Sequence, residues 1–366
     1  MMTPYDVIIV GAGPAGCAAA YDLATHHFSV LLLDKVQFPR MKACAGGLTI
    51  KAVKALRYAI DPVTRQVCNN LEIGKKTEKR MTLKSQAPVA CMTERSEFDL
   101  FCLNKTLTAG AEFRVVKKII AVTEREKWVE LVMEQGTLRS KFLIGADGAN
   151  SSIRKRFAPF PGFRRGFAIE AQAPIKDNRH YDMAFDFGIV TSGYGWVFPK
   201  GDHLNIGLYT FDDRIKLKAD ALRNYCWEKT GHKSIQQPAA FSIGFGGWEY
   251  GPNLKRIFLV GDAAGLADPL LGEGLHNAIK SGQAAAHAIL QETADGDRAS
   301  LCYHKHIGPI KADTLAAYNM ARWFYRFPAI GYALLTFPLM GSKLMKGYAM
   351  GLTLNEIKAR IFNLSL

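Results

Sequence analysis

Short apolar runs at the start of the chain are separated by glycines and by a stretch of small residues. Residues 5–10 form an apolar run rich in β-branched side chains, and residues 29–33 form a second run that ends at Asp34. Between them, residues 15–26 contain no proline and are rich in alanine. Such runs are typical of strands buried on both faces of a parallel sheet. The beginning of the chain therefore predicts a complete strand–helix–strand unit.

A second pattern occupies residues 60–95 and 160–250, where apolar and polar positions alternate and aromatic residues are frequent. This alternation is clear in three runs, Met183–Phe187, Tyr194–Phe198 and Leu204–Leu208. A period of two predicts antiparallel strands with one covered face. Between the two regions we expect a helix over residues 96–107, a hairpin made of residues 115–122 and 128–133, and a strand over residues 138–144.

The first pattern returns near the end of the chain, with a buried strand expected over residues 256–260 and a helix of small residues over 274–290. Residues 302–366 predict helices broken by Pro309, Pro328 and Pro338. The expected fold is α/β (α+β). It has a discontinuous Rossmann-like dinucleotide-binding domain (1–60, 95–160 and 250–300), which is split by an antiparallel substrate domain (61–94 and 161–249). A C-terminal helical region (301–366) follows.

Composition narrows the function classes only partly. The chain has 366 residues with 48% hydrophobic and 22% charged, which excludes a disordered or fibrous protein. The formal charge of +14 attracts anionic partners. Basic residues are spread along the chain without a recognised module, so we do not predict nucleic-acid binding. Seven scattered cysteines with no metal-type spacing favour reduced thiols in the cytoplasm. No run has the length of a membrane-spanning helix, and there is no signal-peptide pattern.

Three glycine-rich turns follow predicted parallel strands. The first contains Gly11, Gly13 and Gly16 in the spacing GxGxxG, which lets backbone N–H groups approach a pyrophosphate at a helix N-terminus. Asp34 follows the next strand, where a carboxylate accepts hydrogen bonds from a ribose diol. We include the neighbouring Ala15 and Lys35 in this predicted site. The second turn, residues 145–148, contains Asp147 and precedes Ser151 and Arg154, and the third, residues 261–265, contains Gly261 and Asp262.

As a set, these turns resemble the signatures GxGxxG, GADGxxSxxR and GDAA of the para-hydroxybenzoate-hydroxylase type of flavoprotein oxidoreductases. The resemblance covers about residues 5–290 and implies FAD as the cofactor. It implies that Asp262 meets the ribityl and pyrophosphate portion and that Arg95 braces the flavin or its phosphates. Amides of the next loop would face the flavin ring, and this loop consists of Gly272, Glu273, Gly274 and Leu275. A helix N-terminus at that position favours reduced flavin, because reduced flavin carries negative charge there.

Two further segments resemble the geranylgeranyl reductases, which saturate isoprenoid double bonds. Tyr194-x-Trp196-x-Phe198-Pro199 with a following Gly207 matches their Y-x-W-x-F-P…G-x-G signature, although Tyr209 stands in place of the second glycine. The segment Lys42-Ala-Cys44-Ala45-Gly46 resembles their K-x-C-G segment with one insertion. The resemblance implies that Lys42, Cys44, Ala45 and Gly46 lie beside the flavin. We predict an apolar substrate tunnel lined by Phe185, Tyr194, Trp196 and Phe198, although these aromatic residues could equally fill an ordinary core.

Saturation of an isolated alkene needs a proton at one carbon as hydride reaches the other. We therefore predict Cys44 as the proton donor and Tyr194 and Trp196 as further catalytic residues, the alternative for Cys44 being a small buried apolar residue. The aromatic and basic segment that begins at Arg322 and includes Lys346 predicts peripheral contact with an anionic membrane, on the inner face. Simple packing of these helices on the substrate domain is the alternative.

Other functions remain open from the sequence. Residues 193–199 are also loosely similar to a halogenase motif, so an FAD-dependent aromatic monooxygenase or halogenase-like enzyme is the alternative reading. The non-enzymatic alternative is a lipid-binding or flavin-sensing protein that uses the same pocket without turnover. The expected electron donor is NAD(P)H or a reduced carrier protein. The sequence does not distinguish between them, because it has no second nucleotide-binding fingerprint. No histidine lies in a hydrolase triad, we expect no metal site, and the oligomeric state is not indicated.

Overall fold

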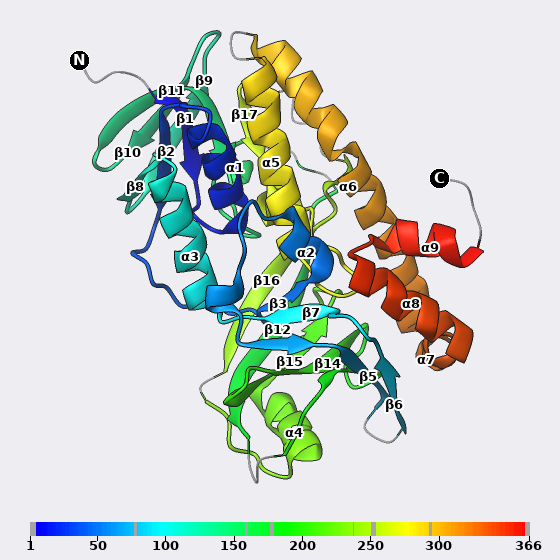
Figure 1. The fold of residues 1–366 in the computed structure, drawn as a ribbon. Helices are drawn as coiled ribbons and strands as arrows, with labels where there is room; N and C mark the ends of the chain where they lie inside the picture. Colours follow the sequence, from blue (N-terminus) through cyan, green and yellow to red (C-terminus); the bar gives the residue numbers. More distant parts are fainter. Residues whose placement is uncertain are drawn as a thin grey trace.

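The computed structural model describes residues 5–362 except 77–78, 158–159, 161, 176–178, 237, 250–253 and 293–294. A sheet of mainly parallel strands lies at one end of the molecule and an antiparallel sheet at the other, and the C-terminal helices lie along one side of both (Figure 1). Several predicted region limits, at residues 1–4, 250–253 and 363–366, lie outside the described residues. The boundaries between the predicted domains stay a prediction.

Three separated parts of the chain build the first sheet. Its strand order is β8-β2-β1-β11-β10-β9, with β17 also paired to β11, and β8, β2, β1, β11 and β17 are parallel. The strands are β1 (Tyr5–Val10), β2 (Val30–Asp34), β8 (Glu112–Val115), β9 (Ile119–Glu124), β10 (Val129–Met133), β11 (Gly136–Gly145) and β17 (Ile257–Leu259). The run of apolar residues in β2 is buried along its whole length, as the absence of alternation predicts.

The expected hairpin is present as β9 and β10, but its first strand begins later than predicted, because residues 116–118 connect the two opposite edges of the sheet. β8 ends at Val115 and pairs with β2 at one edge, whereas β9 begins at Ile119 and pairs with β10 at the other. Helices α1 (Pro14–Ala24), α3 (Arg95–Thr108) and α5 (Leu275–Gln291) accompany this sheet. α1 and α5 cross closely, since a Cβ atom on Gly282 would lie only 2.2 Å from the carbonyl oxygen of Ala15.

The second sheet has the order β16-β12-β15-β14-β13-β5-β6 and is antiparallel except between β13 and β5. Its strands are β5 (Asn70–Lys75), β6 (Lys79–Lys84), β12 (Arg164–Pro174), β13 (Met183–Phe187), β14 (Gly193–Pro199), β15 (His203–Thr210) and β16 (Ala239–Phe245). A small third sheet joins β3 (Gly47–Thr49), β7 (Ala90–Met92) and β4 (Gln66–Cys68). Short helical segments are α2 (Ile50–Ala55), η1 (Asp61–Val63), η2 (Arg154–Arg156), η3 (Gly247–Glu249) and η4 (Gly261–Ala264).

Both faces of this second sheet are covered at its centre, so the expectation of one covered face is wrong there. β14 is buried along its whole length. Residues of one face pack against α4 (Ala219–Thr230), and those of the other face, including Tyr194 and Trp196, belong to an apolar cluster with Phe324 of α6. Successive residues of these strands therefore point into two different apolar clusters, one on each face of the sheet, and not alternately into the core and into solvent.

The C-terminal region consists of α6 (Gly296–Arg326), α7 (Pro328–Thr336), α8 (Pro338–Met350) and α9 (Leu354–Phe362). Pro328 and Pro338 stand at helix starts, as predicted, because a proline at the first helical position loses no intrahelical hydrogen bond. The predicted break at Pro309 is wrong, because α6 continues through it. Among the described helices, none is both long and apolar enough to span a bilayer.

Candidate functional site

The turn between β1 and α1 leaves open space where a phosphate would approach. A Cβ atom would lie 2.4 Å from the carbonyl oxygen of Ala146 if placed on Gly11, and 1.9 Å from that of Gly11 if placed on Gly16, so both glycines are sterically required. On Gly13, in contrast, a Cβ atom would meet only the Nη2 of Arg40, at 3.4 Å. This uncrowded turn, with Ala15 in the first turn of α1, is the expected cradle at a helix N-terminus.

Asp34 lies at the end of β2 beside this turn, as predicted. Its Oδ2 accepts a hydrogen bond of 2.9 Å from the backbone N–H of Ala12, and its Oδ1 accepts one of 3.3 Å from that of Val36. Carboxylate oxygens can accept further hydrogen bonds, so Asp34 can still meet a ribose diol. Lys35 is exposed next to it.

The second and third turns are tied to each other by Arg154. β11 lies between β1 and β17, so the three predicted turns follow adjacent parallel strands and meet at one edge of the sheet. Asp147 accepts a hydrogen bond of 2.6 Å from the backbone N–H of Ser152, which shapes the second turn. The guanidinium of Arg154 donates a 2.9 Å hydrogen bond to the carbonyl of Ala263 in the third turn.

Asp262, after Gly261 in the third turn, faces the start of α5. Its Oδ2 accepts a 3.2 Å hydrogen bond from the backbone N–H of Gly244, and its Oδ1 would lie 3.0 Å from a Cβ atom on Gly274. Burial raises the pKa of Asp262, while the nearby ammonium of Lys42 works in the opposite direction. Gly274 therefore cannot carry a side chain without crowding this carboxylate.

Arg40, which the sequence analysis missed, lies beside Gly13 and shares a carboxylate with the predicted Arg95. Arg95 donates two hydrogen bonds, of 2.8 and 2.9 Å, to the two oxygens of the fully buried Asp99. Arg40 lies 3.3 Å from the same carboxylate and next to Gly13. Among the described residues, the buried Nε of Arg40 has no hydrogen-bond partner. An unsatisfied guanidinium N–H beside an open glycine turn fits the pyrophosphate of a dinucleotide.

The loop that carries Cys44 is held by polar groups from the second sheet. The backbone N–H of Cys44 donates a 2.7 Å hydrogen bond to Glu170, and Lys200 donates to the carbonyls of Ala45 and Thr93 at 2.6 and 2.8 Å. Gly46 is in the left-handed region with φ +63°. The thiol of Cys44 faces the guanidinium of Arg95. Sequence reasoning missed Glu170 and Lys200, although each is a charged residue in or next to an apolar strand.

Trp196 is connected to the same network. Its ring lies against Gly207, where a Cβ atom would be 2.0 Å from the indole. The indole Nε1 donates a 2.7 Å hydrogen bond to Asn205, and Asn205 donates to Glu170 at 3.2 Å. The glycine of the aromatic motif is thus required by Trp196. Burial raises the pKa of Glu170, which is the carboxylate that also holds Cys44.

Three tyrosine hydroxyls hold the loop before Gly272. Tyr209 donates a 2.8 Å hydrogen bond to the carbonyl of Pro269, and Tyr325 and Tyr194 donate to the next two carbonyls, those of Leu270 and Leu271. The residue that replaces the second motif glycine, Tyr209, therefore supports this loop. The Tyr194 hydroxyl also donates to this loop, and its ring lines an apolar cavity.

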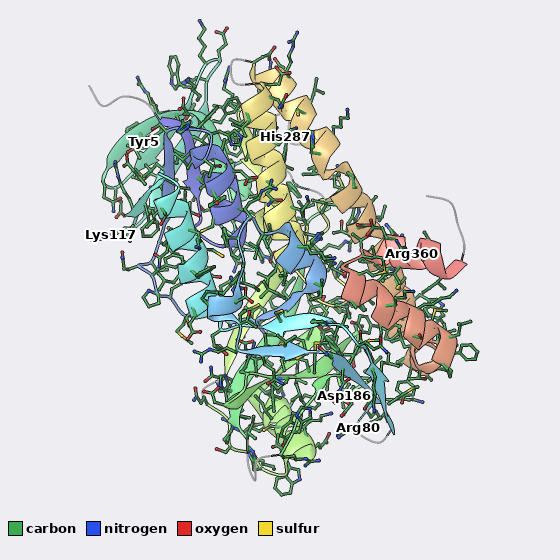
Figure 2. All side chains as sticks on the ribbon, in the orientation of Figure 1. Tyr5, Arg80, Lys117, Asp186, His287 and Arg360 are labelled. Atoms are coloured by element: carbon green, nitrogen blue, oxygen red, sulfur yellow. The ribbon has the colours of Figure 1, made fainter. Side chains whose placement is uncertain are left out.

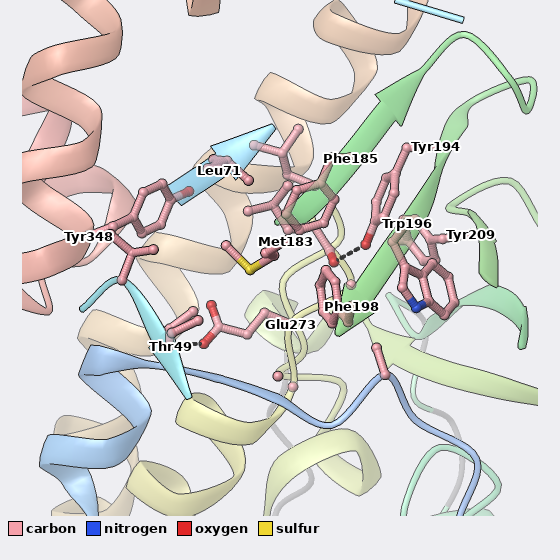
Figure 3. A pocket seen from close by; sticks show the side chains of 18 of the residues that line it. Thr49, Leu71, Met183, Phe185, Tyr194, Trp196, Phe198, Tyr209, Glu273 and Tyr348 are labelled. Atoms are coloured by element: carbon pink, nitrogen blue, oxygen red, sulfur yellow. Dashed lines mark hydrogen bonds between the residues drawn. The ribbon is translucent and has the colours of Figure 1, made fainter. Parts of the chain in front are cut away.

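Glu273 points from this loop toward the small third sheet (Figure 3). It accepts a 2.6 Å hydrogen bond from the hydroxyl of Thr49 and forms a 2.8 Å ion pair with Lys51. Burial disfavours the charged carboxylate, yet the Lys51 ammonium and these hydrogen bonds hold the pKa of Glu273 below its usual value. The loop is thereby fixed to the chain that follows Cys44.

An apolar cavity of about 220 Å³ joins these parts (Figure 3). It is lined by Cys44, Ala45 and Gly46 and by the loop from Gly272 to Leu275. All four predicted substrate residues line it as well, namely Phe185, Tyr194, Trp196 and Phe198. Residues of the C-terminal helices, including Phe324, Met345 and Tyr348, complete the wall. The structure thus brings the predicted flavin loop, the candidate thiol and the aromatic motif into one space.

Comparison with known proteins agrees with this geometry. The FAD binding domain family matches residues 4–180. An uncharacterized protein of Methanosarcina barkeri is 33% identical over 98% of this chain and 94% of its own. The digeranylgeranylglycerophospholipid reductase of Methanosarcina mazei is 30% identical over 81% of this chain and 78% of its own.

Solved structures show the same fold. A geranylgeranyl bacteriochlorophyll reductase-like protein from Thermoplasma acidophilum superposes with a TM-score of 0.79, at 21% identity and 99% coverage of both chains. The flavin-dependent brominase Bmp2 superposes with a TM-score of 0.76, at 20% identity, covering 99% of this chain and 98% of its own.

Fold and site together define a flavin-dependent oxidoreductase whose cofactor is FAD. The chain belongs to the family of FAD-dependent oxidoreductases that includes the geranylgeranyl reductases, which confirms the resemblance seen in its motifs.

Proposed function

We propose that this protein reduces carbon–carbon double bonds of an isoprenoid or similar lipid chain with hydride that FAD supplies when it is bound and reduced. The observation that carries this proposal is the apolar cavity whose wall is shared by Cys44, the loop at Gly272 and the C-terminal helices. The relative from Methanosarcina mazei, which is named for the reduction of a geranylgeranyl lipid, supports the same substrate class.

The residues that would hold FAD lie around the three turns. The backbone amides at Gly13 and the Arg40 and Arg95 guanidinium groups would meet its phosphates, and Asp34 its ribose. Asp262 and Lys42 would lie along the ribityl chain, and the amides from Gly272 to Leu275 would face the ring. The N-terminus of α5 at Gly274 carries about half a positive charge, which favours the reduced cofactor.

The cavity wall selects an apolar chain. Most of its lining residues are aliphatic or aromatic, and each buried CH₂ group of a ligand contributes about 0.8 kcal/mol. Phe185, Trp196 and Phe198 would orient the chain so that one double bond lies near Cys44. Orientation of this kind lowers the entropic part of the barrier.

Cys44 is the proton donor in this proposal. Its backbone is fixed by Glu170, so its thiol has a defined position at the cavity end beside the flavin loop. The thiol would give its proton to one alkene carbon, and Arg95 would face the sulfur afterwards. Tyr194 would position the flavin loop through its hydroxyl, and the ring of Trp196 would form the cavity wall next to the reacting carbon.

The C-terminal helices support contact with a membrane. Ile330, Leu334, Phe337 and Leu339 are between 45% and 62% exposed, and they lie within a few residues of Arg326, Lys343 and Lys346. Apolar side chains flanked by cations are typical of interfacial segments. We propose that these helices rest on an anionic inner membrane face and that the lipid chain enters the cavity from there. NAD(P)H and a reduced carrier protein both remain candidate electron donors.

Anaerobic single-turnover kinetics test the proposal. FAD-loaded protein reduced with dithionite is mixed with a geranylgeranyl phospholipid without oxygen, and flavin absorbance and lipid mass are followed. We expect flavin to be reoxidised and the lipid to gain two hydrogens for each double bond. If the lipid stays unchanged and only oxygen reoxidises the flavin, with an oxygenated aromatic or halogenated product, the protein is a monooxygenase or halogenase and the proposal fails.

A further inference from the structure

Three metal-ligating side chains meet at a place that the proposed reaction does not use. His287 belongs to α5, and Cys302 and His306 belong to α6. One ligand atom of each residue lies within 4.8 Å of those of the other two. Figure 2 shows His287 on α5 next to the upper part of α6. None of the three lines the apolar cavity, so this cluster is separate from the flavin and substrate site.

The two residues of α6 already have the spacing of metal ligands. They are four residues apart, which brings them to the same face of the helix. The Sγ of Cys302 lies 3.6 Å from the Nδ1 of His306. In a tetrahedral zinc site, bonds of about 2.3 Å to sulfur and about 2.0–2.1 Å to nitrogen separate these ligands by roughly 3.5 Å. The thiol and the imidazole are therefore placed as a chelating pair.

The ring of His306 is also oriented by its own helix. Its Nδ1 lies 2.8 Å from the carbonyl oxygen of Cys302, one turn earlier. Ligation through Nδ1 would replace this contact by a bond to the ion, because one ring nitrogen cannot donate to a carbonyl and bind a metal at the same time.

His287 completes the cluster from the facing helix. Its ring centroid lies 4.5 Å from that of His306, and both histidines are exposed while Cys302 is partly exposed. An ion can therefore reach all three side chains from solvent. The separation of at most 4.8 Å closes to that of bound ligands by a small rotation of the exposed His287 side chain.

We propose that His287, Cys302 and His306 bind one Zn²⁺ ion per chain, with water as the fourth ligand. A thiolate with two imidazoles suits Zn²⁺ better than Mg²⁺ or Ca²⁺, which take oxygen ligands. On binding, the Cys302 thiol releases its proton to solvent and its sulfur bonds to the metal. Burial and the nearby Glu292 carboxylate raise the pKa of this thiol, and the nearby Lys305 ammonium lowers it.

The expected role of this ion is to fasten α5 to α6. α5 begins at the loop that would face the flavin ring, and α6 carries Met320 and Phe324 into the cavity wall. A metal bond between the two helices stabilises the folded state, because the unfolded chain does not hold the three ligands together. The sequence spacing does not indicate this site, because only two of the ligands are one helical turn apart and His287 lies 15 residues before Cys302.

Equilibrium dialysis of the FAD-loaded full chain against Zn²⁺, after removal of metal with a chelator, tests the proposal. We expect one Zn²⁺ per chain and a higher melting temperature. Cys302→Ser and His306→Gln should each weaken binding at least about 100-fold, because even loss of an outer-sphere contact costs about 10–100-fold. Cys91→Ser and His26→Gln, which remove a cysteine and a histidine outside the cluster, should bind Zn²⁺ as the unchanged chain does.

Cobalt provides a readout that needs no variant. Co²⁺ bound by thiolate and imidazole in tetrahedral geometry absorbs intensely at the red end of the visible spectrum, beyond the absorption of oxidised flavin. We expect this band in the unchanged chain, together with its loss when Zn²⁺ is added. Absence of the band, absence of Zn²⁺ binding, or unchanged affinity in Cys302→Ser would each overturn the proposal. Flavin content, measured in parallel, shows whether a variant is folded.

Discussion

Cys44 is positioned through its backbone, which leaves its side chain available for chemistry. Glu170 accepts from the Cys44 N–H, and Lys200 holds the next carbonyl, so replacement of the thiol should leave the loop in place. We expect Cys44→Ala to keep its FAD and its melting temperature while single-turnover reduction of the lipid slows about 10²–10⁴-fold, which is the usual contribution of a proton donor. Cys91→Ala is the matched control. Full activity of Cys44→Ala would remove the proton-donor role.

Tyr194 and Tyr209 offer a matched pair at the same scale. Their hydroxyls donate to the carbonyls of Leu271 and Pro269 in one loop. Each change to phenylalanine leaves a carbonyl unpaired, which costs about 1–3 kcal/mol. We expect Tyr194→Phe and Tyr209→Phe to lower the free energy of unfolding by similar amounts in urea titrations and to lower turnover alike. A much larger loss of turnover in Tyr194→Phe would show that its hydroxyl acts in the reaction itself.

At the scale of elements, the loop from Asp268 to Gly274 holds a carboxylate that burial destabilises in its charged form. Burial raises the pKa of Asp268 from 3.8 to about 6, although the Lys51 ammonium acts in the opposite direction. Its Oδ1 accepts a 2.6 Å hydrogen bond from the N–H of Leu270. Because the folded pKa lies above the unfolded one, the fold loses stability as pH rises from about 4 to about 6 and then stays level.

Asp268→Asn keeps the acceptor oxygen and removes this titration. Relative to the unchanged chain, the free energy of unfolding of this variant should rise by about 2 kcal/mol between pH 4 and pH 7, because a shift of about two pKa units is worth about 3 kcal/mol and part of it is already present at pH 4. Denaturant titrations of the FAD-saturated protein at both pH values measure the difference. The exposed Asp213→Asn serves as control, and parallel pH profiles for all three proteins would contradict the argument.

At the scale of the whole molecule, the exposed apolar side chains of α7 and α8 form the expected membrane face. Combined change of Ile330, Leu334, Phe337 and Leu339 to serine removes four side chains that would each gain about 1.5–3 kcal/mol by burial. In flotation with vesicles of phosphatidylglycerol and phosphatidylcholine, we expect the unchanged chain to float and the variant to stay in solution.

The control for this experiment changes exposed apolar residues elsewhere. Ile120, Trp128 and Trp227 are 54%, 40% and 53% exposed, and their change to serine should leave flotation unaltered. Flotation should also weaken at high salt, because part of the attraction comes from the net charge of +14. Equal flotation of both variants would show that the C-terminal helices are not the membrane face.

Local patterns determined the parallel sheet, the three turns and the FAD cofactor. Gly16 and Gly207 could be identified because each is demanded by a neighbour within its own motif, Gly16 by the carbonyl of Gly11 and Gly207 by the ring of Trp196. Gly11 could be identified from its spacing, although the atom that excludes a side chain there belongs to Ala146 of the second turn. A buried strand and the turn that follows it need no distant information, since unbroken apolar runs and glycine spacing express their geometry directly.

Only the tertiary structure decided which distant residues complete the site. Glu170, Lys200 and Arg40 reach Cys44 and Gly13 from strands and loops far apart in the sequence, and their spacing carries no signal of those contacts. The same holds for the two covered faces of the second sheet and for the course of α6 through Pro309. At these places the packing energy between segments outweighs the local conformational preference. A sequence pattern expresses that preference, but it does not show which distant residues will be in contact.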